Sequence, residues 1–575
     1  MSNYYKDNSD IQFHLKHKDL TRVISLIEDD FADRNSFAYA PKDAEDALEN
    51  YRRTLEIVGE IAGAFVAPRA REVDEEGARY ADGEVSYPKA IREAMARINA
   101  ADLAGFILQR KYGGLNMPYT VFSAAIEIFA RADASLTLII SLQALAATIE
   151  KFGSEEQKNR ILPRFATGEI AGSMALTEPD SGSDLQSIML KAVQGSDGKW
   201  RLNGVKRFIT SGCEQLSLVV ARSEEGSSGG RGISLFIYER YDDMKIRRIE
   251  RKLGIRGSPT CELQFNNAEA ELLGQRRMGL VKYTMFLMNS ARLAIAAQAL
   301  GIAEAAYREA NKYATDRSQF KKTIRDIPAV YEMLVNMRIN IEAARSLLYE
   351  TSAMVDIKEG IERKLERHPE KGADLKNDLS RYGRYVSLFT PFIKRYAADM
   401  ANKVCYDAIQ VHGGVGYTRE FDSERHYRDV RVTSIYEGTS QLQVVGAVGG
   451  VVGGVVFERL NEYEHEHDFD AVKTLFTSAQ QLRTRLEAAV SHIKERSDAE
   501  FQEFHAERLV EMATDSVIAY LLCIDSLHSE RKSKLAQLFI SAAQRRVKAH
   551  LDFILSDDLS LVQYYGDIVK ADEPL

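Results

Sequence analysis

Hydrophobic periodicity changes twice along this chain, and that change restricts the possible folds more than any other feature. Apolar residues recur at helical spacing in the first segment, as at Phe122, Ile126 and Phe129, and helical spacing returns after the middle of the chain. Between these regions, residues 171–275 carry short apolar runs separated by Gly, Ser, Asn and Asp clusters, which is typical of a small β domain. We therefore predict an α+β protein in which a β domain separates two helical regions.

The chain has 575 residues, too many for one hydrophobic core. Local signals support its division into parts: a capping box, Ser154 with Gln157, starts a helix, and the glycine-rich loop at 226–232 connects a hairpin. The charged stretch 358–378 is expected to be an exposed excursion between two long helices. We predict an N-terminal helical domain at 1–170 with a short N-terminal extension, a middle β domain at 171–275, a C-terminal helical bundle at 276–457 and an additional helical domain at 458–575.

Composition and charge exclude several classes of protein. The net charge of −8 argues against nucleic acid as the main partner. The first residues carry charges where a secretory signal would need an apolar stretch, so we expect a cytoplasmic protein. The most apolar run, 444–457, is too short to span a bilayer, so no transmembrane segment is expected. Four dispersed cysteines predict neither a disulfide framework nor a metal site, namely Cys213, Cys261, Cys405 and Cys523.

Five short motifs carry the chemistry of this sequence. Alone, each reads as an ordinary turn or strand, but they occur in a fixed order on the helix–β–helix pattern. They are ALTEPDSGSD at 175–184, KRFITSG at 206–212, RSQF at 317–320, QVHGGVGY at 410–417 and SIYEGTSQ at 434–441. Together they resemble the acyl-CoA dehydrogenase family over about residues 50–450. The resemblance implies the acyl-CoA dehydrogenase fold, an FAD cofactor, an acyl-CoA substrate and α,β-dehydrogenation of the thioester to a 2-enoyl-CoA.

Glu437 matches the catalytic base of that family. The resemblance implies that its carboxylate removes the α-hydrogen as a proton while the β-hydrogen leaves as hydride to flavin N5. A carboxylate in an apolar pocket has its pKa raised toward neutrality, which suits a base. The Glu437 backbone N–H is expected to donate to the thioester carbonyl, and Gly438 to contact substrate. In some relatives the base precedes the arginine that matches Arg292; here that residue is Ala291, which cannot act as a base.

The β domain supplies the residues expected at the flavin ring. By resemblance, Thr177 contacts the flavin pyrimidine edge, Thr210 bonds N5, and Leu176 contributes backbone hydrogen bonds. Phe208 stands where many relatives carry tryptophan, and it preserves an aromatic wall. Ser183 matches a serine that reaches both the flavin pyrophosphate and the pantetheine of the substrate.

Two arginines are predicted to lie on one long helix. Twenty-five residues separate Arg292 from Arg317, which places them roughly 37 Å apart, too far to serve one ligand. The resemblance implies that Arg292, with Asn289 nearby, faces the CoA of its own subunit. It also implies that Arg317 reaches the pyrophosphate of a neighbouring subunit's FAD, with Gln319 and Phe320 lining it. Lys321 stands where relatives often have glycine.

The remaining matches complete the predicted cofactor site. A first group resembles the contact with the adenosine diphosphate of the neighbouring flavin, because glycines let the backbone come close to a phosphate or a ring. It consists of Gln410, Val411, Gly413 and Gly414. Thr439 and Gln441 follow the base and are expected to complete the flavin contacts, and Ser234 aligns with a substrate-contacting threonine. His412 is expected to pack rather than to take part in catalysis.

Residues 458–575 have no counterpart in the common shorter members of the family. With an insertion near 355–385, they resemble the larger methylthiopropionyl-CoA dehydrogenase type, which is often dimeric, so we expect a homodimer. An apolar stripe from Val472 to Ile493 must be buried against something. We expect it to pack on the bundle around 293–313, with a membrane surface as the alternative.

Three functions remain possible from the sequence. The first is a dehydrogenase that passes electrons to an electron-transfer flavoprotein. The second is a flavin oxidase on the same fold, which passes them to oxygen. The third is a nucleic-acid-binding relative, but this would need a basic C-terminal region and no base, whereas residues 458–575 mix both signs and Glu437 is present. The sequence does not specify the acyl chain of the substrate.

Overall fold

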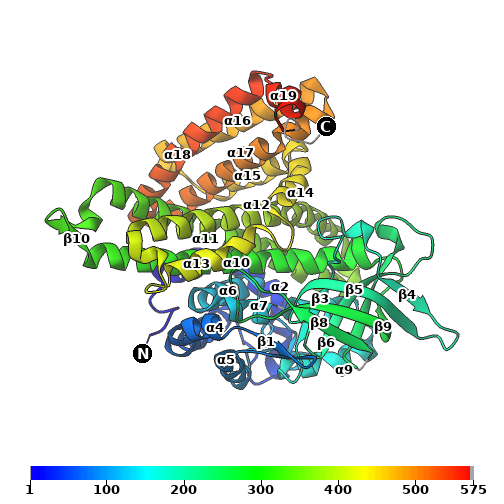
Figure 1. Cartoon of the computed structure of the whole chain (residues 1–575). Coiled ribbons are helices and arrows are strands. Elements are labelled where there is room, and N and C mark those ends of the chain that lie inside the picture. Colours follow the sequence, from blue (N-terminus) through cyan, green and yellow to red (C-terminus); the bar gives the residue numbers. More distant parts are fainter. Residues whose placement is uncertain (1, 142, 242, 570–575) are drawn as a thin grey trace. The chain divides into compact units, whose positions relative to one another are not determined.

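The computed structural model describes residues 2–141, 143–241 and 243–569, and its chain forms two compact units (Figure 1). The first unit contains Met1–Val386 with Ile393–Ser440, and the second contains Ser387–Phe392 with Gln441–Leu575. The first unit therefore includes the predicted N-terminal, β and bundle regions as far as Ser440. The second unit begins earlier in the chain than the predicted position 458.

The N-terminal region of the first unit is helical, as predicted. The helix α6 (Tyr119–Ala132) is buried along nearly its whole length, which explains its apolar sequence. The predicted capping box is present: Ser154 Oγ accepts from Gln157 N, and Ser154 N donates to Gln157 Oε1. Other elements here are α1 (Ser9–His17), α2 (Thr21–Ile27), α3 (Ala44–Glu60), α4 (Ala70–Glu76), β1 (Arg79–Ala81), β2 (Glu84–Ser86), α5 (Lys89–Ala100), α7 (Ala134–Ser141), α8 (Gln143–Phe152) and α9 (Glu155–Ala166).

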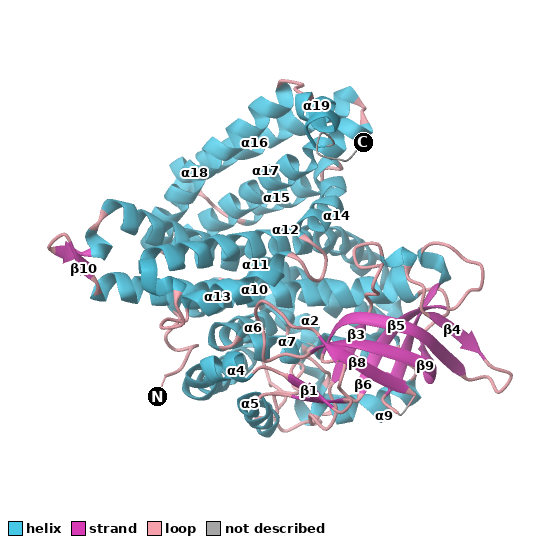
Figure 2. Cartoon of the chain, viewed as in Figure 1, coloured by secondary structure: helices cyan, strands magenta, loops and turns pink. Residues whose placement is uncertain are grey.

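The middle region forms a β sheet with an apolar core on each face (Figure 2). The predicted hairpin around 226–232 is confirmed, because β6 and β7 pair antiparallel from Leu216↔Glu239 to Arg222↔Ile233. The long strand β5 pairs with β9, and their register shifts between Lys206 and Ile209, which marks a bulge. The strands are β3 (Gly172–Ala175), β4 (Lys191–Gln194), β5 (Trp200–Thr210), β6 (Leu216–Arg222), β7 (Ile233–Glu239), β8 (Met244–Ile249) and β9 (Thr260–Leu273).

Long helices form the rest of the first unit. Arg292 lies in α10 (Met285–Asp316) and Arg317 caps its C-terminal end, so the prediction of one helix between them is confirmed. The charged stretch 358–378 contains the predicted break between two long helices, but most of the stretch is helical and is not an excursion. Its first part continues α11 (Pro328–Arg367), because its charges form i,i+4 pairs such as Lys358–Glu362 on the helix surface. Only a short turn precedes α12 (Gly372–His412), which is followed by α13 (Ser423–Val430).

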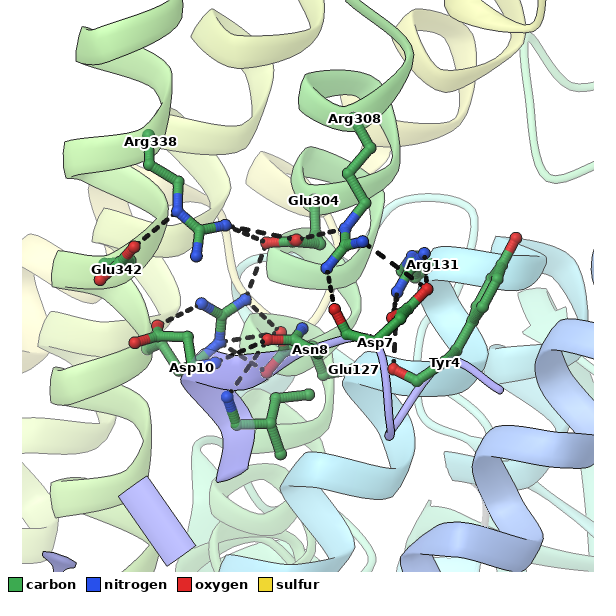
Figure 3. A network of polar contacts seen from close by, with 12 residues as sticks. Tyr4, Asp7, Asn8, Asp10, Glu127, Arg131, Glu304, Arg308, Arg338 and Glu342 are labelled. Carbon is green, nitrogen blue, oxygen red and sulfur yellow. Dashed lines mark hydrogen bonds and ion pairs between the residues drawn. The ribbon is translucent and has the colours of Figure 1, made fainter. Parts of the chain in front are cut away.

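A buried ionic cluster ties α10 to three other elements of the first unit. Arg345 of α11 donates to Glu127 of α6 at 2.6 Å, to Glu304 of α10 at 3.0 Å and to Asp10 of α1 at 2.5 Å. The acidic side chains converge there, and Arg338 and Arg308 reach Glu304 as well (Figure 3). This cluster fixes the N-terminal extension and the middle of α10 to the same point of the bundle.

The second unit is helical and has a core of its own. The predicted apolar stripe is confirmed in α16 (Lys473–Arg496), whose Leu482, Leu486 and Ile493 are buried. Our expectation that the stripe needs the 293–313 bundle or a membrane as its partner is wrong, because α16 packs against α17 (Ala499–Ser526) and α18 (Glu530–Leu555) of its own unit. The unit also contains α14 (Ser440–Val452, from Gln441 on), α15 (Val455–Glu466) and α19 (Ser560–Val569).

Two helical stretches of the described chain are long and apolar enough to cross a membrane by length and composition alone. They are Ala134–Phe152, of which 86% of the apolar window is buried, and Gly279–Asp316, of which 72% is buried. The first forms part of the N-terminal helical core, and the second contains α10 at the centre of the bundle. Burial inside the protein therefore accounts for the apolar character of both.

Candidate active site

The loop that carries Glu437 has an unusual backbone conformation. Glu437 has φ 53° and Gly438 has φ 88°, so two consecutive residues lie in the left-handed region. Glycine adopts that region freely, but a glutamate in that conformation costs about 1–3 kcal/mol of backbone strain. Such strain persists only where the surroundings hold the residue in place, and it is concentrated at functional sites.

The loop is held from the N-terminal half of α10. Tyr436 Oη donates to Gln298 Oε1, and Gln298 Nε2 in turn donates to the carbonyl of Ala134 at 2.9 Å. Arg292 Nε donates to the Glu437 carbonyl at 3.5 Å, and Arg292 Nη1 donates to Asn289 Oδ1 at 3.3 Å. The predicted residues Arg292, Asn289 and Glu437 therefore lie together.

A second set of contacts to the loop comes from α12. Lys394 is fully buried, and its Nζ donates to the Gly438 carbonyl at 2.5 Å. Five residues further along α12, Asp399 Oδ1 accepts from Ser440 Oγ at 2.8 Å. We did not predict Lys394 from the sequence; the mainly apolar stretch 385–393 immediately before it was the signal that could have identified it.

Charge and burial act in opposite directions on the half-buried Glu437. Burial raises the pKa of its carboxyl above the ordinary value, while the Arg292 and Lys394 cations act to lower it. Burial lowers the pKa of Lys394 to about 8, against the Glu437 and Asp399 carboxylates, which act to raise it. A carboxylate whose pKa is raised by burial is a better proton acceptor than an exposed one, and the two cations favour its ionised form.

The β domain presents a second cluster, built on a buried ion pair. Lys206 is fully buried, and its Nζ donates to Glu178 Oε1 and to the Leu176 carbonyl, both at 2.8 Å. Glu178 also accepts from the backbone N–H groups of Met189 at 2.6 Å and Leu190 at 3.0 Å. Next to this pair, Arg207 N donates to the Thr177 carbonyl at 2.9 Å. These contacts hold the loop containing Leu176 and Thr177 against the bulge in β5.

That bulge presents an aromatic side chain to the outside. Phe208 has φ 61° and is 52% exposed, although its neighbours Lys206 and Ile209 are buried. Arg207 lies over the Phe208 ring at 4.6 Å from the centroid. Thr177 and Thr210 are half-buried, and Ser183 is exposed in the loop after β3. An exposed aromatic ring beside small hydroxyls on a rigid support fits a planar, polar-edged cofactor such as a flavin.

Ser234 differs from the expectation. It is fully buried, its Oγ is 2.7 Å from Ser223 Oγ, and it accepts from Arg277 N at 2.8 Å. The serine therefore connects β7 to the segment between β9 and α10. Its burial argues against direct contact with substrate.

The residues expected to serve a second subunit lie at the other end of α10. There β10 (Ser318–Gln319) and β11 (Lys322–Thr323) form a hairpin with a two-residue loop. The loop residues Phe320 and Lys321 have φ angles of 53° and 65°. Phe320 is 86% exposed, and Arg317 and Gln319 are exposed as well. The hairpin lies at the end of α10 away from the sheet (Figure 1).

The turn after α12 carries the rest of this group. Gly413 and Gly414 are exposed, and a Cβ on either would meet nothing within 4 Å, while Gln410 is exposed and Val411 buried. His412 is buried and stacks on Tyr313 with ring centroids 4.6 Å apart, which confirms its packing role. Gln441 is exposed in α14 of the second unit, and Thr439 is half-buried beside the base. Within the described ranges, no group of three or more His, Cys, Asp or Glu side chains could hold a metal ion.

Family models match the chain almost from end to end. They are described as the acyl-CoA dehydrogenase N-terminal domain at residues 49–169, middle domain at 173–268, C-terminal domain at 281–445 and a further "Acyl-CoA dehydrogenase C terminal" at 452–559. The chain belongs to the acyl-CoA dehydrogenase family, as a larger member with an additional C-terminal helical domain. It is thus an FAD-dependent oxidoreductase that acts on the CH–CH bond of acyl-CoA thioesters.

Individual relatives agree with this assignment. The chain is 32% identical over 452 residues to 3-methylmercaptopropionyl-CoA dehydrogenase of Ruegeria pomeroyi, covering 73% of this chain and 74% of the relative. Butyryl-CoA dehydrogenase from Megasphaera elsdenii has a similar structure, with a TM-score of 0.60 and 30% identity over 70% of this chain and 98% of its own. An acyl-CoA dehydrogenase from Bacillus anthracis, solved with FAD, shares the fold over 93% of this chain and 92% of its own, with a TM-score of 0.74 and 20% identity.

Proposed function

We propose that this enzyme removes two hydrogens across the α–β bond of a CoA thioester, with Glu437 as the base that accepts the α-proton. The observation that carries the proposal is the state of Glu437: a strained, half-buried carboxylate whose pKa is raised by burial, placed beside Arg292 and Lys394. FAD, when bound, supplies the acceptor for the β-hydrogen as hydride. Ala291 leaves the alternative base position of the family without a carboxylate.

The surrounding residues have separate tasks in this proposal. The backbone N–H of Glu437 donates to the thioester carbonyl, where negative charge develops as the α-proton leaves. Arg292 and Asn289 lie beside the loop and bind the CoA portion together with Ser183 and Gly438. On the β domain, the flavin is held by Leu176, Thr177, Phe208 and Thr210, and Thr439 completes the contacts beside the base.

The exposed group at the far end of α10 supports a shared cofactor site in a homodimer. Phe320 is 86% exposed, and Gly413 and Gly414 have free space around them. An exposed aromatic ring and accessible backbone at glycines suit contact with another chain. The residues proposed to contact the partner's FAD are Arg317, Gln319, Phe320, Gln410, Val411, Gly413 and Gly414. Gln441, like Thr439, is proposed to complete the flavin contacts that follow the base. A guanidinium at Arg317 suits a pyrophosphate because its planar fork can donate two hydrogen bonds.

The electron acceptor in this proposal is an electron-transfer flavoprotein, and the enzyme works in the cytoplasm. The family resemblance supports both. A flavin oxidase on the same fold differs in one observable: its substrate-reduced flavin is reoxidised rapidly by dissolved oxygen. Stopped-flow mixing of the reduced enzyme with air-saturated buffer, with and without an electron-transfer flavoprotein, separates the two.

The substitution Glu437→Gln tests the base assignment. Glutamine is nearly isosteric but cannot accept the proton, so flavin reduction by a good acyl-CoA substrate should fall by about 10²–10⁴-fold. FAD should remain bound, because the substitution leaves the cofactor contacts intact. Glu420→Gln, which changes an exposed carboxylate to its amide, is the matched control and should reduce normally. Anaerobic bleaching of the flavin band measures both, and normal bleaching in Glu437→Gln would refute the assignment.

A further inference from the structure

Among the described residues of the first unit, two lysines have no exposed surface, and they are bonded in different ways. Lys206 donates to a carboxylate, Glu178, at 2.8 Å, so its charge is compensated by a direct ion pair. Lys394 instead donates to a backbone carbonyl, that of Gly438, at 2.5 Å. Burying an ammonium is expensive unless a partner repays the desolvation. The partner that Lys394 has at hydrogen-bond distance belongs to the catalytic loop, one residue after the base.

We propose that Lys394 is a positioning residue for Glu437: it fixes the Gly438 carbonyl, and so the left-handed loop, and its positive charge keeps the base ionised before substrate binds. The inference rests on the proposed role of Glu437 and adds a residue to that same site.

The mechanical part of this role follows from the backbone. Glu437 and Gly438 both have positive φ, and the peptide between them turns the Glu437 carboxylate relative to the chain on either side. Arg292 holds the Glu437 carbonyl from α10, Lys394 holds the Gly438 carbonyl from α12, and Asp399 holds the Ser440 hydroxyl. Two successive carbonyls are thus fixed by cations on two different helices. Without Lys394, one of the supports that resist relaxation of the strained residue is lost.

The electrostatic part follows from the charges that face the two groups. Arg292 from α10 and Lys394 from α12 face Glu437, with the Tyr436 phenol next to it in the loop. Glu437, Asp399 and Arg292 face Lys394. Burial raises the pKa of Glu437 and the two cations oppose it, so removing one cation leaves burial less opposed. The pKa of Glu437 should then rise, and less of the enzyme would hold an ionised base at neutral pH.

Two substitutions separate the mechanical and electrostatic parts. Lys394→Met keeps the aliphatic stem but removes both the donor and the charge, whereas Lys394→Gln keeps a donor without the charge. In Lys394→Met, the acidic limb of the kcat/KM pH profile should move up by about one pH unit or more, and the plateau rate should fall with little change in KM. Lys394→Gln should keep the moved limb but recover part of the plateau. Lys403→Met, the same change at an exposed lysine of α12, is the control and should change neither.

A measurement without turnover checks the same coupling. A glutamate whose folded pKa is raised destabilises the fold as pH rises from its unfolded value to its folded value. The difference in unfolding temperature between the parent and its Glu437→Gln variant should therefore change over that interval, and in the Lys394→Met background the interval should extend to higher pH. This comparison can also be made with Lys394→Gln if Lys394→Met does not fold.

The outcomes distinguish this inference from the one on which it rests. If Glu437→Gln reduces its flavin normally, the base assignment fails whatever Lys394 does. If Glu437→Gln is inactive but both Lys394 variants fold with an unmoved acidic limb and an unmoved stability interval, Glu437 remains the base and Lys394 only packs. A moved limb in Lys394→Met with an unmoved limb in Lys403→Met supports the positioning role.

Discussion

The two ends of α10 are built in opposite ways. At its N-terminal end, Arg292 and Gln298 contact a loop of the same chain, and Lys394 of α12 closes the other side. At its C-terminal end, the helix passes into a hairpin whose Phe320 is 86% exposed. The chain thus holds its Glu437 loop with its own side chains, whereas the residues around Phe320 are exposed to the outside. The difference agrees with our proposal that proton abstraction needs one chain, whereas cofactor retention depends on a second.

The middle of α10 connects the two ends. Glu304 lies about one turn beyond Leu300 and is held by Arg345, Arg338 and Arg308 (Figure 3). Arg345 has no exposed surface, and neither have Asp10 and Glu304. A buried charge cluster of this kind adds little net stability when complete, but losing its central cation leaves several carboxylates uncompensated. From the position of this cluster we predict that losing Arg345 lowers the stability of the fold strongly and changes the rate of flavin reduction little.

The largest effect on stability is therefore expected for Arg345→Met. The variant leaves Asp10, Glu127 and Glu304 without their common partner, and unfolding free energy should fall by about 3–5 kcal/mol. The loss should shrink as pH falls, because these carboxylates are neutralised on protonation and burial already raises the pKa of Glu127. Thermal unfolding at several pH values measures it.

Arg338→Met is the control for that experiment, because Glu304 keeps Arg345 and Arg308 when Arg338 is removed. It should cost clearly less than Arg345→Met. The folded fraction of both variants should reduce flavin at the parental rate. Equal losses in the two variants would show that Arg345 is not the centre of the cluster, and a slowed reduction would show that the cluster does affect the catalytic loop.

Features that depend on short stretches of the chain could be predicted from the sequence. The helix–β–helix order, the capping box at Ser154 and the single helix from Arg292 to Arg317 depend on local periodicity and spacing, and the structure confirms them. The α16 stripe was found for the same reason, but its partner was predicted wrongly. Periodicity shows that a face is buried and does not show which surface covers it.

Long-range polar pairs were not predictable from one sequence. Arg345 meets Glu127 across 218 positions and Asp10 across 335. Lys394 reaches Gly438 across 44. Many charged side chains could form such pairs, and spacing along the chain does not discriminate among them. The Glu437 motif was found because its residues are contiguous, whereas its supports on α10 and α12 are not. The site-residue assignments taken from the family resemblance remain predictions.

An intermediate effect is expected for Arg317→Ala at the outward end. If Arg317 donates to the pyrophosphate of the partner's FAD, its loss removes a charge-assisted hydrogen bond of about 1.5–3 kcal/mol, which corresponds to about tenfold or more in cofactor affinity. The variant should purify with less flavin per chain, while the flavin that it retains should be reduced normally. The ratio of flavin to protein absorbance after gel filtration at micromolar concentration measures this.

Lys312→Ala provides the charge-matched control, because it removes an exposed cation from the same helix, four residues before Asp316. It should retain flavin fully. Light scattering coupled to size exclusion should show a dimer for the parent protein. Full flavin content in Arg317→Ala, or a monomeric parent with full flavin, would contradict the shared site.

The smallest effect is expected at the tip of the same hairpin. Phe320 and Lys321 occupy the two central positions of a turn that needs positive φ at both, where Asn-Gly or Gly-Gly is preferred. A lysine in the left-handed region costs about 1–2 kcal/mol, and glycine avoids this cost. Glycine itself costs about 0.5–1 kcal/mol, because it has greater freedom in the unfolded chain. Lys321→Gly should therefore stabilise the hairpin by about 0.5–1 kcal/mol and slow hydrogen exchange of the amides from Ser318 to Thr323.

Lys322→Gly, one residue later in β11, should do the reverse, because glycine weakens a strand. If the turn is strained in order to present Phe320 to a partner chain, Lys321→Gly should leave flavin content unchanged, since Phe320 itself is untouched. Faster exchange in Lys321→Gly than in the parent would show that the lysine side chain contributes more to the hairpin than its backbone strain costs.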